Sequence, residues 1–207
     1  MLELLPAIPA ATWFTFLAAS IALNLTPGSD VMFISASAAA GGPRAGVAAA
    51  LGISAGSLLH VALAVLGVAA LIQSSQAAWL ILRWGGAAYL LWLAWGLWRA
   101  PPPGRTTGGN RRAWRAFRRG AANCALNPKV SVFVLAFLPQ FADPALGPLW
   151  VQIALFGLVF ALGSVPVNIG WALAASALGA PIRRAGRMMN RLAAGVFALL
   201  AARLVWE

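Results

Sequence analysis

The feature that most constrains this chain is an apolar run from Thr12 to Ala40 that is interrupted by Asn-Leu-Thr-Pro-Gly-Ser-Asp at residues 24–30. The run is long enough to cross a bilayer as a helix. Pro27 removes one helical hydrogen bond and Gly28 adds backbone freedom, so a helix should break there. A carboxylate such as Asp30 costs about 2.5–3.5 kcal/mol at the bilayer centre. We therefore interpret the interruption as a solute site of a transporter, with a kinked helix and a snorkelling Asp30 as the alternative.

The composition places the chain in a membrane. Of its 207 residues, 61% are hydrophobic and 9% are charged, too little polar surface for a soluble domain. The formal net charge is +11, but eleven of the fifteen Lys and Arg residues lie in two short segments, Arg99–Arg119 and Arg183–Arg191. This clustering indicates membrane topology rather than nucleic-acid binding. A single cysteine, Cys124, excludes an internal disulfide and a cysteine metal cage, and we expect no metal and no cofactor.

The hydropathy pattern predicts an all-α membrane protein, with residues 1–207 forming one transporter domain of six transmembrane helices. The expected helices are residues 12–40, 45–72, 79–98, 120–141, 148–179 and 192–206. Prolines should interrupt the first, fourth and fifth of these helices, at Pro27, Pro128 and Pro166. Residues 99–119, rich in Pro, Gly and Arg, are expected to link a first repeat (12–98) to a second (120–206).

The two halves of the sequence correspond at an offset of 101 residues. This offset places Pro27 on Pro128, Pro43 on Pro144, Gly46 on Gly147 and Gly56 on Gly157. Because each half contains three helices, the two halves must have opposite orientations in the bilayer. Two inverted repeats with broken helices are typical of transporters with a site near the membrane midplane.

Small residues and loop charges give two further predictions. Ala48, Gly52 and Gly56 recur every four residues, which predicts a face where another helix packs closely. Positive charges lie in the first, third and fifth loops, whereas the second loop has none and the fourth carries Asp143. The positive-inside rule then places the basic loops in the cytoplasm and both termini outside.

Several motifs of the chain resemble those of the LysE/RhtB amino-acid exporters. They are Asn-Leu-Thr-Pro-Gly-Ser-Asp at 24–30, Gly-Gly-Pro-Arg-Ala-Gly at 41–46, Ala-Leu-Gly-Ile-Ser-Ala-Gly at 50–56, Gly-Gly-Ala-Ala-Tyr-Leu-Leu-Trp-Leu at 85–93, Leu-Asn-Pro-Lys at 126–129 and Phe-Leu-Pro-Gln-Phe at 137–141. The family usually has Pro-Gly-Pro in the first motif, where this chain has Ser29 in place of the second proline. The resemblance implies six helices in the bacterial inner membrane. It also implies efflux of amino acids or related small metabolites, driven by the proton gradient.

The residue chemistry fits an amino-acid substrate, which needs an acceptor for its ammonium and a donor for its carboxylate. Asp30 and Lys129 are the only acid and base expected deep within the spans. We expect Asp30 to bind the ammonium in competition with a proton, and Lys129 or the free N–H groups of the break to bind the carboxylate. The remaining candidates supply neutral hydrogen bonds or handle protons: Asn24, Thr26, Asn127, Asn168 and His60. The alternatives are a permanent Asp30–Lys129 ion pair that fastens the halves together, and a packing role for His60.

Other classes of function fit the sequence less well. One histidine, one cysteine and two non-terminal acids leave little for an enzyme's nucleophile, base or metal. A scaffold or assembly protein needs no charged, broken helices. A channel, by contrast, remains an alternative function. The expected partners are a small zwitterion, protons and the lipid bilayer, with no nucleic acid; a homo-oligomer is compatible with the sequence.

Overall fold

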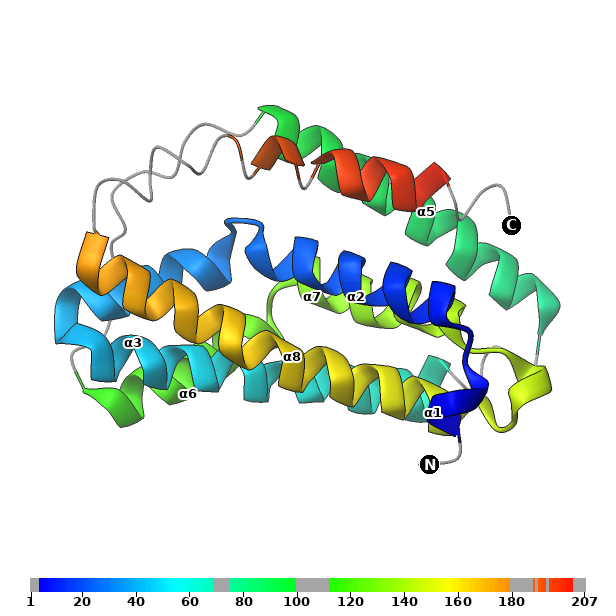
Figure 1. The fold of residues 1–207 in the computed structure, drawn as a ribbon, viewed down its shortest axis with the longest axis horizontal. Coiled ribbons are helices and arrows are strands. Elements are labelled where there is room, and N and C mark those ends of the chain that lie inside the picture. Colours follow the sequence, from blue (N-terminus) through cyan, green and yellow to red (C-terminus); the bar gives the residue numbers. More distant parts are fainter. Residues whose placement is uncertain are drawn as a thin grey trace.

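The computed structural model describes residues 4–68, 75–99 and 112–178, together with 188, 190–192 and 194–202. These residues contain helices and turns but no strand, as an all-α protein requires. The helices are α1 (Leu4–Ala7), α2 (Ala10–Leu25), α3 (Ser29–Leu63), α5 (Gln76–Arg99), α6 (Ala113–Ala125), α7 (Pro128–Val132) and α8 (Leu149–Leu178) (Figure 1). Shorter π- or 3₁₀-helical segments are η1 (Ala64–Val68), η2 (Phe133–Phe137), η3 (Leu138–Phe141) and η4 (Pro144–Leu146). A C-terminal helix covers Asn190–Ala202.

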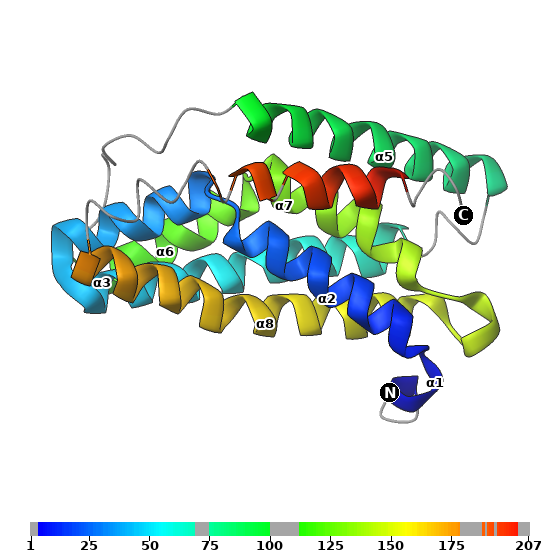
Figure 2. The same cartoon turned by 45° about the horizontal axis from the view of Figure 1, so that its top comes forward.

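The first broken helix has the predicted interruption. α2 ends at Leu25 and α3 begins at Ser29, so Pro27 and Gly28 lie between them. α3 then folds back on itself at Gly42, whose φ of 72° lies in the left-handed region that favours glycine. The two legs of α3 lie side by side (Figures 1 and 2). The turn expected at residues 41–44 is therefore present, as a kink at Gly42 that separates the two helical legs of α3.

The second broken helix consists of α6 followed by α7, η2 and η3. Its two parts, Ala113–Ala125 and Pro128–Phe141, meet at an angle of 54°, so the interruption predicted at Pro128 is confirmed. α6 begins at Ala113, seven residues before the expected start at residue 120. The earlier start has a packing cause, because Ala116 and Gly120 are buried.

The interruption predicted at Pro166 is wrong. α8 runs from Leu149 to Leu178 with Pro166 inside it. Proline removes one hydrogen bond from a helix, and neighbouring helices in a bundle can compensate for such a loss. α8 packs along α3 over much of its length, so the missing bond does not end it (Figures 1 and 2).

Two helical stretches of the described residues are long and apolar enough to cross a membrane. They are Leu149–Ala177 and Ser29–Gly67, the second of which contains the fold-back at Gly42. The second broken helix, Ala113–Ala125 with Pro128–Phe141, is a third candidate span if its two parts are counted as one. α2 and the C-terminal helix are apolar but shorter. The described residues thus form only helices and turns, with two to three clear candidate spans by length and composition.

Glycines bring α3 and α6 into backbone contact, as the small-residue pattern predicts. A Cβ atom added at Gly52 would lie 2.0 Å from the carbonyl oxygen of Phe117, and one at Gly56 would lie 2.5 Å from that of Ala121. On the other helix, a Cβ at Gly120 would lie 2.5 Å from the carbonyl oxygen of Ala49. Only glycine permits this approach, so the two helices pack through their backbones.

Four aromatic rings form a cluster, named here the aromatic cluster, between the start of α2, the start of α8 and the end of η3. Its members are Trp13, Phe16, Phe141 and Phe156. Phe16 lies at the centre, with ring centroids 4.9 Å from Phe156 and 5.4 Å from Phe141, and both Phe16 and Phe156 are fully buried. These helix ends lie at the right of Figure 1, whereas α6 begins at the left.

Candidate functional site

The two helix breaks meet, and the buried carboxylate of Asp30 lies where they do. Its two oxygens accept hydrogen bonds from the side-chain amides of Asn123 (2.6 Å) and Asn127 (2.8 Å). Asp30 belongs to the first turn of α3, and the two asparagines belong to the end of α6 and the loop that follows it. Only 8% of Asp30 is exposed, so these two amides replace the water that the carboxylate has lost.

The side chain of Lys129 crosses to the first break. Pro27 has no N–H group, so the carbonyl of Leu23, four residues earlier, lacks its usual α-helical donor. The ammonium of Lys129 donates to this carbonyl at 2.9 Å and to the carbonyl of Thr26 at 3.1 Å. A cation from the second half of the chain therefore caps the carboxyl end of α2, the end where a helix dipole favours positive charge.

His60 occupies the matching position at the second break. Pro128 likewise leaves the carbonyl of Cys124 without its α-helical donor, and Nε2 of His60 lies 3.0 Å from that oxygen. Since a carbonyl can only accept, Nε2 carries the hydrogen. Nδ1 of His60 is buried and has no hydrogen-bond partner within the part of the chain that the structure describes.

Asn127 connects the acid with the base. Its Nδ2 donates to Asp30, and its Oδ1 accepts from the backbone N–H of Lys129, which makes it the N-cap of α7. Among the described residues, the carboxylate of Asp30 contacts amides and the ammonium of Lys129 contacts carbonyls, so the two charges are linked through Asn127 rather than by a direct bond. This arrangement keeps opposite charges at adjacent breaks without joining them.

The other candidates from the sequence bond elsewhere. Asn24 donates to the carbonyl of Ser20 within α2, and the fully buried Thr26 donates to that of Ala22. Asn168 donates to the hydroxyl of Ser54, 3.2 Å away, which places it in a second polar group between α3 and α8. Gly28 leaves room beside Lys129, because a Cβ there would lie 3.5 Å from the ammonium nitrogen, an ordinary contact.

Three residues of this region were not among the predicted site residues. Asn123 lies four residues before Asn127, and this short spacing of two amides could have indicated a shared partner. Trp171 donates its indole N–H to the carbonyl of Asn24 at 3.2 Å. Ser164 shares a hydrogen bond of 2.8 Å with Ser54. No pattern in the sequence distinguishes Trp171 or Ser164 from other residues of an apolar helix.

Comparisons with known proteins found relatives over most of the chain. The chain is 32% identical to the homoserine/homoserine lactone efflux protein of Salmonella typhimurium over 196 residues, 93% of this chain and 95% of that protein. It is 31% identical to an uncharacterized membrane protein of Vibrio cholerae over 189 residues, 89% of this chain and 92% of that one. It is also 30% identical to the leucine efflux protein of Klebsiella pneumoniae over 134 residues, 63% of each chain. No solved structure matches the chain. The model of the LysE type translocator family matches residues 21–207, and the chain belongs to this family.

Proposed function

We propose that this protein is a secondary transporter that exports amino acids or related small metabolites from the bacterial cytoplasm in exchange for protons. The observation that carries the proposal is the buried carboxylate of Asp30, held by amides at the meeting point of two helix breaks. Irregular backbone beside a buried charge is the usual construction of a solute site in transporters.

The chemistry of the relatives' named substrates supports Asp30 as the central contact. Homoserine and leucine each carry an ammonium and a carboxylate, whereas homoserine lactone keeps the amine but has its carboxylate closed into a ring. The feature common to all three is the amino group, so an acidic acceptor is the one contact that each of them needs. Asp30 is the buried acid at the breaks.

We propose that substrate ammonium and a proton compete for Asp30. While one of them is bound, the other is excluded, which couples the two fluxes. Lys129, released from the carbonyls of Leu23 and Thr26, would meet a substrate carboxylate. Asn127 would change partners with each step, since it bonds to both Asp30 and the backbone of Lys129.

The proposal includes six transmembrane helices in two inverted three-helix repeats, in the bacterial inner membrane. Figures 1 and 2 support it, because the first broken helix (α2 with the first leg of α3) and the second (α6 with α7) run in opposite directions. The reciprocal capping also supports it: Lys129 caps the break at Pro27, and His60 caps the break at Pro128. Asn24, Thr26 and Asn168 are proposed as further neutral contacts in other states of the cycle.

A counterflow experiment with the purified protein in liposomes tests the function. Unlabelled leucine, homoserine or homoserine lactone inside the vesicles should accelerate uptake of the same labelled compound from outside. An imposed pH gradient should also drive this uptake. The matched control is the 2-hydroxy analogue of leucine, which has the same side chain and carboxylate but no amino group. Transport of this analogue at the rate of leucine would contradict a site built on Asp30, and flux without counterflow acceleration would indicate a channel.

The topology is a separate prediction. With basic loops in the cytoplasm and both termini outside, a cysteine introduced at Ala7 should react with an impermeant thiol reagent in intact cells. A cysteine at Thr106 should be protected until the cells are opened. The native Cys124 is buried, so it gives little background. Labelling of Thr106→Cys but not of Ala7→Cys in intact cells would invert the orientation and exchange the entry and exit sides.

A further inference from the structure

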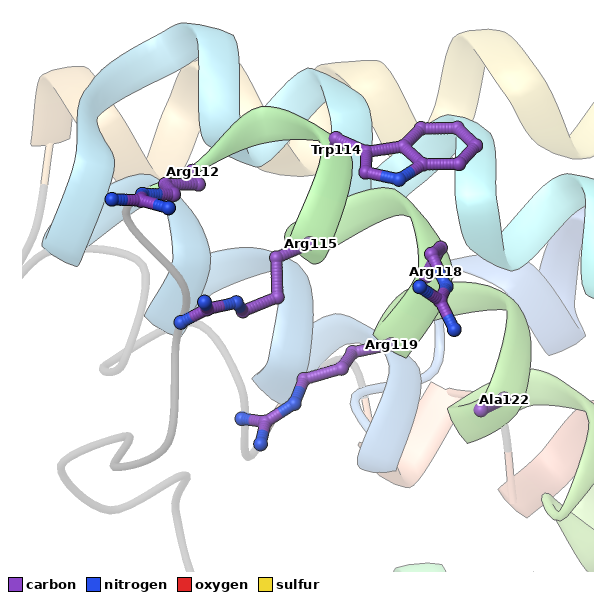
Figure 3. Close-up of a pocket in the computed structure, with 6 residues that line it drawn as sticks. All are labelled: Arg112, Trp114, Arg115, Arg118, Arg119 and Ala122. Carbon is purple, nitrogen blue, oxygen red and sulfur yellow. The ribbon is translucent and has the colours of Figure 1, made fainter.

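The start of α6 carries a hollow lined by arginines, which the transport proposal does not use. The hollow has a volume of about 580 Å³ and is lined by Arg112, Trp114, Arg115, Arg118, Arg119 and Ala122 (Figure 3). Arg112, Arg115 and Arg119 follow one another at helical spacing, and their side chains extend toward the same side of α6 (Figure 3). We name these three residues with Arg118 the arginine cluster.

Among the residues that the structure describes, no carboxylate pairs with the arginine cluster. The whole chain has four acidic side chains, Glu3, Asp30, Asp143 and Glu207. Of the two that the structure describes, Asp30 is bound by asparagine amides and Asp143 caps η4. Within the described ranges, none of the four guanidinium groups forms an ion pair with another residue. These four adjacent, exposed cations can therefore bind an anion that comes from outside the chain.

The position of the cluster favours a lipid as the source of that anion. Trp114 is 68% exposed and stacks on Phe117 with ring centroids 5.6 Å apart, which is the behaviour of a residue at a membrane–water interface. The remaining part of α6, after Gly120, leads into the break at Pro128. In the proposed topology the arginines would lie near the level of lipid phosphates, and their long side chains could reach head groups there.

We infer that the arginine cluster binds the phosphate of an anionic phospholipid. Arg112 and Arg119 are separated by seven residues, about 10 Å along a helix axis, so the cluster can contact two phosphates at once. Guanidinium groups bind phosphate through paired hydrogen bonds, so arginines suit a phosphate site better than lysines do. A basic hollow next to membrane helices is a recognised setting for acidic lipid head groups.

Native mass spectrometry of the full-length protein tests this inference without measuring transport. Delipidated protein is titrated with phosphatidylglycerol, cardiolipin or phosphatidylcholine, and the retained lipid is counted. We expect both anionic lipids to bind more tightly than phosphatidylcholine. Arg115→Gln combined with Arg119→Gln should reduce anionic-lipid affinity about 30-fold, because each arginine near a membrane surface contributes about fivefold.

The matched control removes the same charge at other basic positions. Arg44 and Arg99 lie outside the hollow, so the double variant Arg44→Gln and Arg99→Gln should keep the wild-type lipid preference. Equal loss in both double variants would show a general charge effect and overturn the site. Complete competition by inorganic phosphate at the same phosphate concentration would also overturn it, because the site would then take a soluble anion. Because the experiment measures lipid binding, a negative result leaves the transport proposal unaffected. A failure of the transport proposal likewise leaves the lipid site unaffected.

Discussion

Asp30→Asn is expected to leave the protein folded in the membrane and to abolish transport driven by a proton gradient. The asparagine keeps the size of the side chain but removes the charge that an ammonium needs and the group that a proton titrates. It can accept a hydrogen bond from only one of Asn123 and Asn127 where the carboxylate accepts from both. Loss of one such bond costs about 1–3 kcal/mol. The measurement is pH-driven uptake into liposomes, normalised to inserted protein.

Two further variants separate coupling from structure. Asp143→Asn changes the other described carboxylate, which caps η4 away from the breaks, and should transport like the wild type. If Asp30 only balanced the charge of Lys129, Asp30→Asn would mainly lower the amount of folded protein, and adding Lys129→Met would restore both folding and transport. A well-folded Asp30→Asn protein with full pH-dependent transport would refute the role of Asp30.

Gly52→Ala is expected to be the most destabilising glycine-to-alanine change among the glycines that the structure describes. Its Cβ would lie 2.0 Å from the carbonyl oxygen of Phe117 and 2.8 Å from the carbonyl carbon, so α3 and α6 would have to separate. Both clashing atoms are backbone, which cannot turn aside as a side chain can. We expect a loss of about 3 kcal/mol or more, measured as a lower thermal unfolding midpoint and less monodisperse protein after extraction.

The control for this prediction is Gly163→Ala in α8, where an added Cβ meets nothing within 4 Å. Alanine favours a helix over glycine by about 1 kcal/mol, so this variant should be at least as stable as the wild type. Gly120→Ala, which meets the carbonyl oxygen of Ala49 at 2.5 Å, should resemble Gly52→Ala. Equal stability of the Gly52 and Gly163 variants would show that the two helices do not need their close contact.

The helix breaks show what can be predicted from local sequence. Pro27 and Pro128 were predicted correctly as interruptions, and each is accompanied by residues that favour a break: Gly28 after the first and the N-capping Asn127 before the second. Pro166 has neither, and packing of α8 along α3 keeps that helix continuous. Proline alone thus weakens a helix, and its surroundings decide whether the helix ends.

The start of α6 and the partners of the buried charges depend on the tertiary structure. The arginines of α6 were interpreted as part of a linker, although Ala116, Gly120 and Cys124 recur every four residues and form its buried face. Asp30 and Lys129 were identified as the important charges, and the structure places both at the breaks. Their partners could not be predicted, because the sequence does not show which side chain will reach a carbonyl that has lost its α-helical donor to proline. Only the folded chain shows that Lys129 reaches Leu23 and that His60 reaches Cys124.

The aromatic cluster has a consequence for the leakage of protons across the membrane. In the proposed orientation it lies at the outer end of the protein, where Phe16 and Phe156 have no exposed surface. Protons cross proteins along chains of hydrogen-bonding groups, and of these four side chains only Trp13 carries one, its indole N–H. We therefore expect the packed rings to hinder the passage of protons at this end of the protein. If the protein exchanges solute for protons as proposed, this packing would limit the leak of protons through the protein between transport cycles.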